Sequence, residues 1–164
     1  MRSFPLPGKI PPGRAYVHDD LPKLYTPCSP LGSADFRALR DLDGDVILIE
    51  WDVAVDRANL ARFAQLAEGR DWPVVAPHYK VAEDGHTIHW VHFWQGRPVG
   101  PGELFCDRFA PGLVYLPAGL LRGCPDSDEG CEVMNEGVIG RYLRSRPDWR
   151  PYPIAWDITT VHLH

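Results

Sequence analysis

The sequence lacks the features that mark a membrane, secreted or nucleic-acid-binding protein. No apolar run approaches the ~20 residues that a membrane-spanning helix needs. The first residues, MRSFPLPGKIPPG, contain no apolar segment of the kind found in a secretory signal. The formal net charge of the 164 residues is −5, whereas a broad nucleic-acid-binding surface needs clustered Lys and Arg. We therefore expect no membrane span and no nucleic-acid partner.

Cysteine is scarce, and its spacing excludes the simplest zinc sites. The chain has four cysteines, and no two of them are spaced as CxxC, so a zinc knuckle is not expected. They are Cys28, Cys106, Cys124 and Cys131. We expect reduced thiols, as in a cytoplasmic protein.

Proline, glycine and apolar residues are plentiful. The hydrophobic fraction of 45% and the charged fraction of 24% are ordinary for one globular domain, here residues 1–164. Prolines are concentrated at the start of the chain, so residues 1–14 are predicted to form an extended Pro-rich arm. Four arginines near the other end are interpreted as a solvated helix face: Arg141, Arg144, Arg146 and Arg150.

The first half of the chain alternates helical and strand patterns. A short helix, ADFRALRDL, precedes the strand Val46–Trp51, and Asp56 is a plausible N-cap for the helix RANLARFAQLAEG. A second apolar strand, PVVAPHYKV, follows. The four consecutive aliphatic residues of VILI are typical of a strand buried on both faces, which is commonest in parallel sheets. This order of elements indicates an α/β domain.

The second half has a different pattern. GHTIHWVHFWQG alternates with a period of two, which predicts an antiparallel hairpin or lid. A strand at Leu113–Leu116, a helix in CEVMNEGVIGRYLRSR and a final strand in IAWDITTVHLH complete the predicted elements.

Two acids, Glu50 and Asp52, follow the VILI strand. If the strand continued through them, both side chains would project from one face at its carboxyl end, where open α/β sheets bind ligands. Carboxylate oxygens suit Mg²⁺ or Mn²⁺, which also keep positions for water and phosphate. The alternative is a pair of solvated acids in a loop.

Histidines form two further candidate groups. His162 and His164 lie two apart, and imidazole often accompanies carboxylates around Mn²⁺, although the alternative is a disordered tail. His86, His89 and His92 suggest a cupin-like site. Strand geometry argues against that site, because His89 would point away from the other two.

Four segments, taken in order, resemble a known family: GDVILIEWDV, GLVYLPAGLLRG, MNEGVIGRYL and VHLH. Together they are similar to the GT-A glycosyltransferases, especially family-2-like inverting enzymes, over roughly residues 32–164. The resemblance implies an α/β, GT-A-like (nucleotide-diphospho-sugar transferase) three-layer sandwich with a mixed, mainly parallel sheet. The fold would be reduced in size, because only about forty-five residues precede the acidic motif.

The resemblance also implies roles for particular residues. Asp52 would be the principal ligand of a divalent metal (Mn²⁺ or Mg²⁺), and His162 or His164 would join it late in the chain. Glu136, in place of the second member of the family's acidic pair, would be the catalytic base.

Four residues are implied to contact the nucleotide-sugar donor. Glu50 would contact the ribose, or the metal through water, and Trp51 lies inside the same motif. Asp19 or Asp20, in AYVHDD, would lie near the nucleotide base.

The predicted function is a metal-dependent glycosyltransferase that moves a sugar from a nucleotide-sugar donor to a hydroxyl acceptor. The alternative is a non-catalytic carbohydrate- or nucleotide-binding module of the same fold. Because a shortened N-terminal half would leave a sheet edge exposed, a homo-oligomer is also predicted.

Overall fold

The computed structural model describes residues 14–18, 21–26, 33–41, 44–50, 52–125 and 135–162. Side chains are described from residue 37 onward within these ranges, except those of residues 135–137. The predicted arm, residues 1–14, lies outside the described part apart from Arg14. None of the helices in the described ranges has the length and apolar character needed to cross a bilayer.

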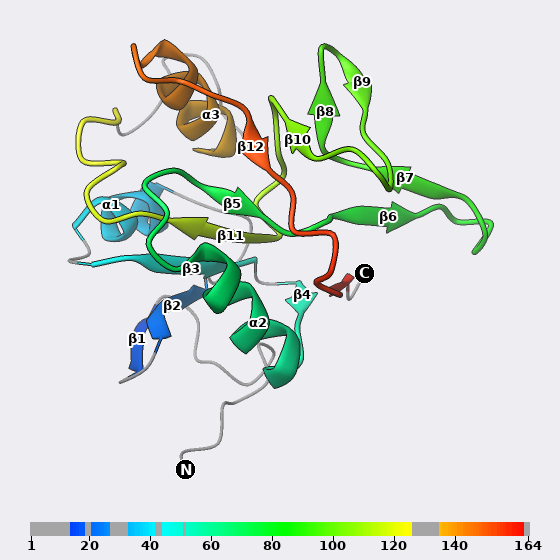
Figure 1. Ribbon diagram of the computed structural model, residues 1–164, viewed down its shortest axis with the longest axis horizontal. Helices are drawn as coiled ribbons and strands as arrows, with labels where there is room; N and C mark the ends of the chain where they lie inside the picture. Colours follow the sequence, from blue (N-terminus) through cyan, green and yellow to red (C-terminus); the bar gives the residue numbers. More distant parts are fainter. Residues whose placement is uncertain are drawn as a thin grey trace.

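A five-stranded sheet forms the centre of the molecule (Figure 1). Its strands, in spatial order, are β1 (Arg14–His18), β2 (Leu21–Thr26), β3 (Val46–Ile49), β11 (Leu113–Leu116) and β5 (Val74–Val75). β2 and β3 are parallel, whereas β1–β2, β3–β11 and β11–β5 are antiparallel.

The predicted GT-A-like sandwich with a mainly parallel sheet is therefore wrong. The VILI strand is buried throughout, as expected, but β11 returns beside it in the antiparallel direction, pairing Leu113 with Ile49 and Leu116 with Val46. A continuous apolar run requires only that both faces of the strand be covered. It does not specify the direction of the neighbouring strand.

Helices cover both faces of this sheet (Figure 1). Ile47 and Ile49 face the core that includes α2 (Arg57–Ala67). Val46 and Leu48 face the core that includes residues of α1 (Ser33–Asp41) and α3 (Asn135–Ser145). Burial of each aliphatic side chain stabilises the fold by about 1.5–3 kcal/mol, so β3 contributes to both cores.

Helix α2 forms as its sequence predicts. Asp56 caps it by accepting a 2.8 Å hydrogen bond from the backbone N–H of Asn59. The four predicted inward residues are buried: Leu60, Phe63, Ala64 and Ala67. The helix ends before Gly69, whose φ of +69° is a conformation that glycine adopts without strain.

Four two-stranded sheets surround the central one. They pair β4 (Val53–Ala54) with β13 (Val161–His162), β6 (Tyr79–Val81) with β7 (Ile88–Trp90), β8 (Phe93–Trp94) with β9 (Arg97–Pro98), and β10 (Phe105–Cys106) with β12 (Tyr152–Pro153). All four pairs are antiparallel.

Three predicted elements are shorter than expected. The segment PVVAPHYKV is split into β5 and β6, and GHTIHWVHFWQG is split into β7 and β8, where His92 turns inward. The final segment is strand only at Val161–His162 among its described residues, apart from an isolated bridge between Ile154 and Val75. A turn in which Ile158 donates to the Ala155 carbonyl interrupts it.

Candidate functional site

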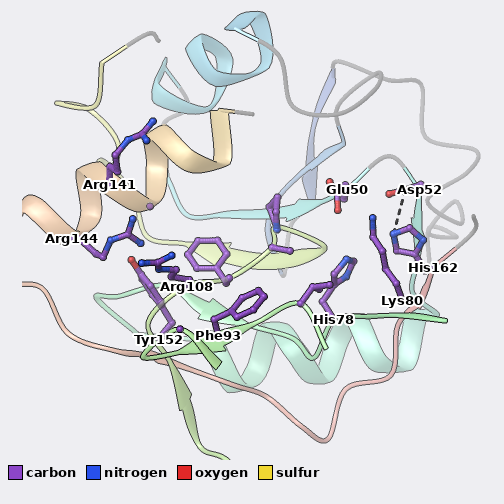
Figure 2. Close-up of a pocket in the computed structure, with 16 residues that line it drawn as sticks. Glu50, Asp52, His78, Lys80, Phe93, Arg108, Arg141, Arg144, Tyr152 and His162 are labelled. Atoms are coloured by element: carbon purple, nitrogen blue, oxygen red, sulfur yellow. Dashed lines mark ion pairs between the residues drawn. The ribbon is translucent and has the colours of Figure 1, made fainter. Parts of the chain in front are cut away.

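A cavity of about 710 Å³ opens beside the central sheet (Figure 2). One part, here called the Asp52 end, is lined by Glu50, Asp52, His78, Lys80 and His162. The other, here called the arginine end, is lined by Arg108, Arg141 and Arg144. Phe93 lies between them.

Strand pairing brings Asp52 and His162 together although they are 110 positions apart in the sequence. The chain turns directly after β3, with the Val53 N–H donating to the Glu50 carbonyl at 3.1 Å. β4 begins at Val53 and pairs with β13 so that His162 lies opposite Val53. The strand therefore does not continue through the two acids as predicted, yet Glu50 and Asp52 both line the cavity.

The Asp52 carboxylate is buried and only partly satisfied. Its Oδ2 lies 3.4 Å from Nε2 of His162, and the residue is 9% exposed. Its Oδ1 is buried and makes no hydrogen bond with any described residue. A buried carboxylate oxygen without a partner costs about 1–3 kcal/mol or more, so a bound cation would relieve that cost.

The geometry of the pair is compatible with a shared cation. Two ligand atoms at about 2.1 Å from an octahedral ion, at right angles, lie about 3 Å apart. The 3.4 Å between Asp52 Oδ2 and His162 Nε2 needs only a small adjustment. Carboxylate oxygen with imidazole nitrogen is a donor set that suits Mn²⁺.

Two of the three predicted metal ligands are therefore brought together, and His164 lies outside the described residues. Within the described part of the chain, no group of three His, Cys, Asp or Glu side chains converges on one point. The cupin-like alternative does not form, because His86 and His89 are exposed whereas His92 is buried. Further positions on a cation would be available to water, ligand phosphates or His164.

His78 is a residue of this site that the sequence analysis missed. It is 4% exposed, and its ring packs edge-on to His162 with 5.2 Å between centroids. Gly112 makes room for it, because a Cβ at that position would lie 2.2 Å from His78 Nδ1. Burial, followed by the nearby His92, His162 and Lys80, lowers the pKa of His78 to about 3, so its ring is neutral at pH 7.

His92 supports the wall behind His78. Its Nε2 lies 2.7 Å from the Ala76 carbonyl, and its Nδ1 accepts from the Ala110 N–H at 3.3 Å. These partners fit a neutral ring with the proton on Nε2. Burial lowers the pKa of His92 to about 4, although the bond to Ala76 opposes that shift.

The basic cluster that was interpreted as a solvated helix face is largely exposed, and part of it also lines the cavity. Arg146 does pair with Asp148, at 2.8 Å, and Arg150 pairs with Asp71. Arg141 and Arg144 line the cavity from α3, at the same end as Arg108 from the segment after β10 (Figure 2). No sequence signal connects Arg108 with α3, because only the folded chain brings them to one cavity.

Several predicted site residues lie outside the described part of the structure. These are Asp19, Asp20, Trp51 and His164. Glu136 lies in the first turn of α3, but its side chain is not among those described. Its backbone is one helical turn before Gly140, which lines the cavity.

Comparison with protein-family models, with curated proteins and with solved structures gave no match. The resemblance to glycosyltransferases therefore stays a prediction. A functional assignment has to come from the residues that line the cavity.

Proposed function

We propose that the chain is a metal-dependent glycosyltransferase that uses a nucleotide-sugar donor and a hydroxyl acceptor. The observation that supports this most directly is the pairing of the buried Asp52 with the partly buried His162 in the wall of the cavity. The unpartnered Oδ1 of Asp52 favours a cation there. The cavity volume of about 710 Å³ is also in the range of about 300–1,000 Å³ that is usual for ligand sites.

The residues of the Asp52 end fit the needs of sugar transfer. A divalent cation held by Asp52 and His162 would neutralise negative charge on the leaving diphosphate. Lys80 extends from β6 toward the same end and adds positive charge there (Figure 2). The acceptor hydroxyl oxygen forms the new bond to the anomeric carbon, the bond from that carbon to the diphosphate breaks, and the diphosphate leaves with the electron pair.

The acceptor hydroxyl must also lose its proton. Glu136 is the proposed base, since it lies in the first turn of the helix that contributes Gly140, Arg141 and Arg144 to the cavity. This assignment of roles does not depend on a parallel sheet. It requires only that the loop after β3, the strand β13 and the helix α3 meet at one cavity.

A second candidate is a binding module that holds a phosphorylated ligand without turning it over. One observation favours it: among the described residues that line the cavity, the carboxylates are Glu50 and Asp52, both at the same end. The described lining therefore holds no carboxylate at the arginine end, away from the proposed metal ligands.

Thermal unfolding and donor hydrolysis together distinguish the two candidates. Uridine and guanosine diphosphates and their hexose conjugates would be tested with and without Mn²⁺. A ligand that binds only the native state raises its stability by RT ln(1 + [L]/Kd). Release of nucleoside diphosphate would be followed in the same samples, for the wild type, Asp52→Asn and Glu136→Gln.

The matched control is Asp56→Asn, which removes a nearby carboxylate outside the cavity and keeps a good N-cap. The transferase proposal predicts stabilisation and hydrolysis that need Mn²⁺, both lost in Asp52→Asn and retained in the control. Glu136→Gln should bind but not hydrolyse. Stabilisation without hydrolysis in the wild type supports the binding module, and no stabilisation by any ligand contradicts both candidates.

A further inference from the structure

The cavity concentrates positive charge in a protein that is negative overall. Four basic side chains line it, against two carboxylates, whereas the formal net charge of the chain is −5. Three of the four, Arg108, Arg141 and Arg144, belong to the arginine end (Figure 2). A concave site lined by one sign of charge focuses the field and attracts ligands of the opposite sign.

Two of these arginines, Arg108 and Arg144, form no ion pair within the part of the chain that the structure describes. Elsewhere, Arg62, Arg146 and Arg150 each pair with an aspartate. Arg108 and Arg144 therefore differ from these three in that they line the cavity and form no ion pair with a described residue.

The backbone places these guanidinium groups on neighbouring surfaces. Arg141 and Arg144 are three residues apart on α3, so their side chains leave adjacent parts of the helix surface. Gly140 leaves space beside them, because a Cβ there would lie 3.3 Å from Nη1 of Arg144. Arg108, from the segment after β10, lies beside Tyr152 and Arg144 (Figure 2).

Tyr152 supplies a second polar feature at this end. Its hydroxyl is buried and makes no hydrogen bond with a described residue, and it points toward Arg108 and Arg144 (Figure 2). An anion held by the arginines would offer this hydroxyl an acceptor. Such an anion would satisfy the hydroxyl and neutralise the guanidinium groups together.

We infer that the arginine end binds the phosphate of a phosphate monoester, on a second ligand that occupies the cavity together with the donor. A phosphate monoester carries about −1.5 to −2 charges near pH 7 and three acceptor oxygens, which match several guanidinium forks. A single carboxylate carries one negative charge, so it would balance only one of the two guanidinium groups of Arg108 and Arg144. The identification of this ligand as the acceptor rests on the proposed function, but the phosphate site itself does not.

Calorimetric titration with glucose 6-phosphate, in EDTA and without nucleotide, tests the site directly. Glucose and glucuronic acid serve as the neutral and carboxylate probes. The wild type should bind glucose 6-phosphate at least about tenfold more tightly than either, because hydrogen bonds to charged groups are among the strongest. Inorganic phosphate should compete for the same site.

Arg108→Gln and Arg144→Gln should each weaken binding by at least about tenfold. Arg146→Gln is the matched control, since Arg146 lies two residues from Arg144 but pairs with Asp148 outside the cavity. It should change the affinity by less than about twofold. Thermal unfolding of each variant would verify that it is folded, and both cavity arginines are exposed, so little loss of stability is expected.

A repeat titration with saturating Mn²⁺ and nucleoside diphosphate separates this inference from the proposed function. Unchanged glucose 6-phosphate binding means two sites, as inferred, whereas displacement by the nucleotide means one shared site and overturns the inference. The inference is also overturned if the wild type does not bind glucose 6-phosphate. It is overturned too if Arg146→Gln loses as much affinity for glucose 6-phosphate as Arg108→Gln and Arg144→Gln do. If phosphate binds but no nucleotide does, the arginine site stands and the donor assignment fails.

Discussion

The two ends of the cavity are built in different ways. At the Asp52 end, backbone pairing between β4 and β13 holds a buried acid and a histidine 3.4 Å apart. At the arginine end, long exposed side chains come from α3 and from the segment after β10. A metal ion needs ligand atoms fixed to within a few tenths of an ångström, whereas an anion among several guanidinium groups tolerates more movement.

This difference predicts how large the effect of a substitution at each end should be, and how far salt should change it. A change at the Asp52 end should remove an interaction that depends on geometry, so its effect should be large and specific. A change at the arginine end should remove one of several charges, so its effect should be smaller and reduced by salt.

The largest expected effect is that of Asp52→Ala, which removes the carboxylate at the centre of the proposed metal site. Mn²⁺-dependent release of nucleoside diphosphate should fall by at least about a hundredfold, because a truncated metal ligand costs more than the 10–100-fold typical of outer-shell partners. Binding of glucose 6-phosphate in EDTA should change by less than about twofold. Equal losses at both ends would contradict the separation of the two sites.

Gly112→Ala should perturb the Asp52 end without removing any functional group. The new Cβ would lie 2.2 Å from His78 Nδ1, so His78 must move, and His162 packs against His78. Overpacking of this kind costs about 1–3 kcal/mol, to be measured by chemical denaturation. Mn²⁺ affinity should fall as well, and an unchanged affinity would show that His78 does not position His162.

Acid should weaken the wall behind His78, which His92 supports. The pKa of His92 is about 4 in the folded protein, below its ordinary value of 6.5, so the unfolded chain binds a proton first as the pH falls. The stabilisation is complete well above pH 6.5 and declines toward pH 4. His92 should contribute a loss of about 2 kcal/mol in unfolding free energy between pH 8 and pH 5.

His92→Gln provides the comparison for that prediction. An amide N–H in place of Nε2–H can still donate to the Ala76 carbonyl, and it does not titrate. The pH dependence of the unfolding free energy should therefore be smaller by about 2 kcal/mol over this range. An unchanged pH profile would mean that His92 is not the titrating group.

The smallest effect is expected for Lys80→Gln. Lys80 is an exposed charge near the proposed diphosphate position, so its loss should weaken nucleoside diphosphate binding by several-fold at low salt and less at high salt. Titrations at two ionic strengths would measure this. Loss of all nucleoside diphosphate binding in Lys80→Gln would contradict this prediction and show that Lys80 is a principal ligand of the diphosphate.

Local sequence patterns predicted the individual elements well. The cap at Asp56, the buried face of α2 and the strand Leu113–Leu116 each follow from residues close in sequence. The direction of strand pairing did not follow, because the burial of VILI reflects the helices on both faces of the sheet and not its neighbours.

The candidate site, too, depends on contacts between residues distant in sequence, which local patterns do not predict. Asp52 and His162 were predicted as ligands of one ion, and the structure brings them together through a strand pairing that the sequence does not specify. His78 and Arg108 were missed because their importance arises only from residues distant in sequence, namely Gly112 and α3.

The most direct test of the central claim is a calorimetric titration of Mn²⁺ into the protein saturated with uridine or guanosine diphosphate. The account predicts that the wild type binds one Mn²⁺ per chain and that Asp52→Asn binds it at least about tenfold more weakly, while Asp56→Asn behaves as the wild type. Equal Mn²⁺ affinity in the wild type and in Asp52→Asn, or no Mn²⁺ binding with either nucleotide, would contradict a metal site at Asp52 and His162.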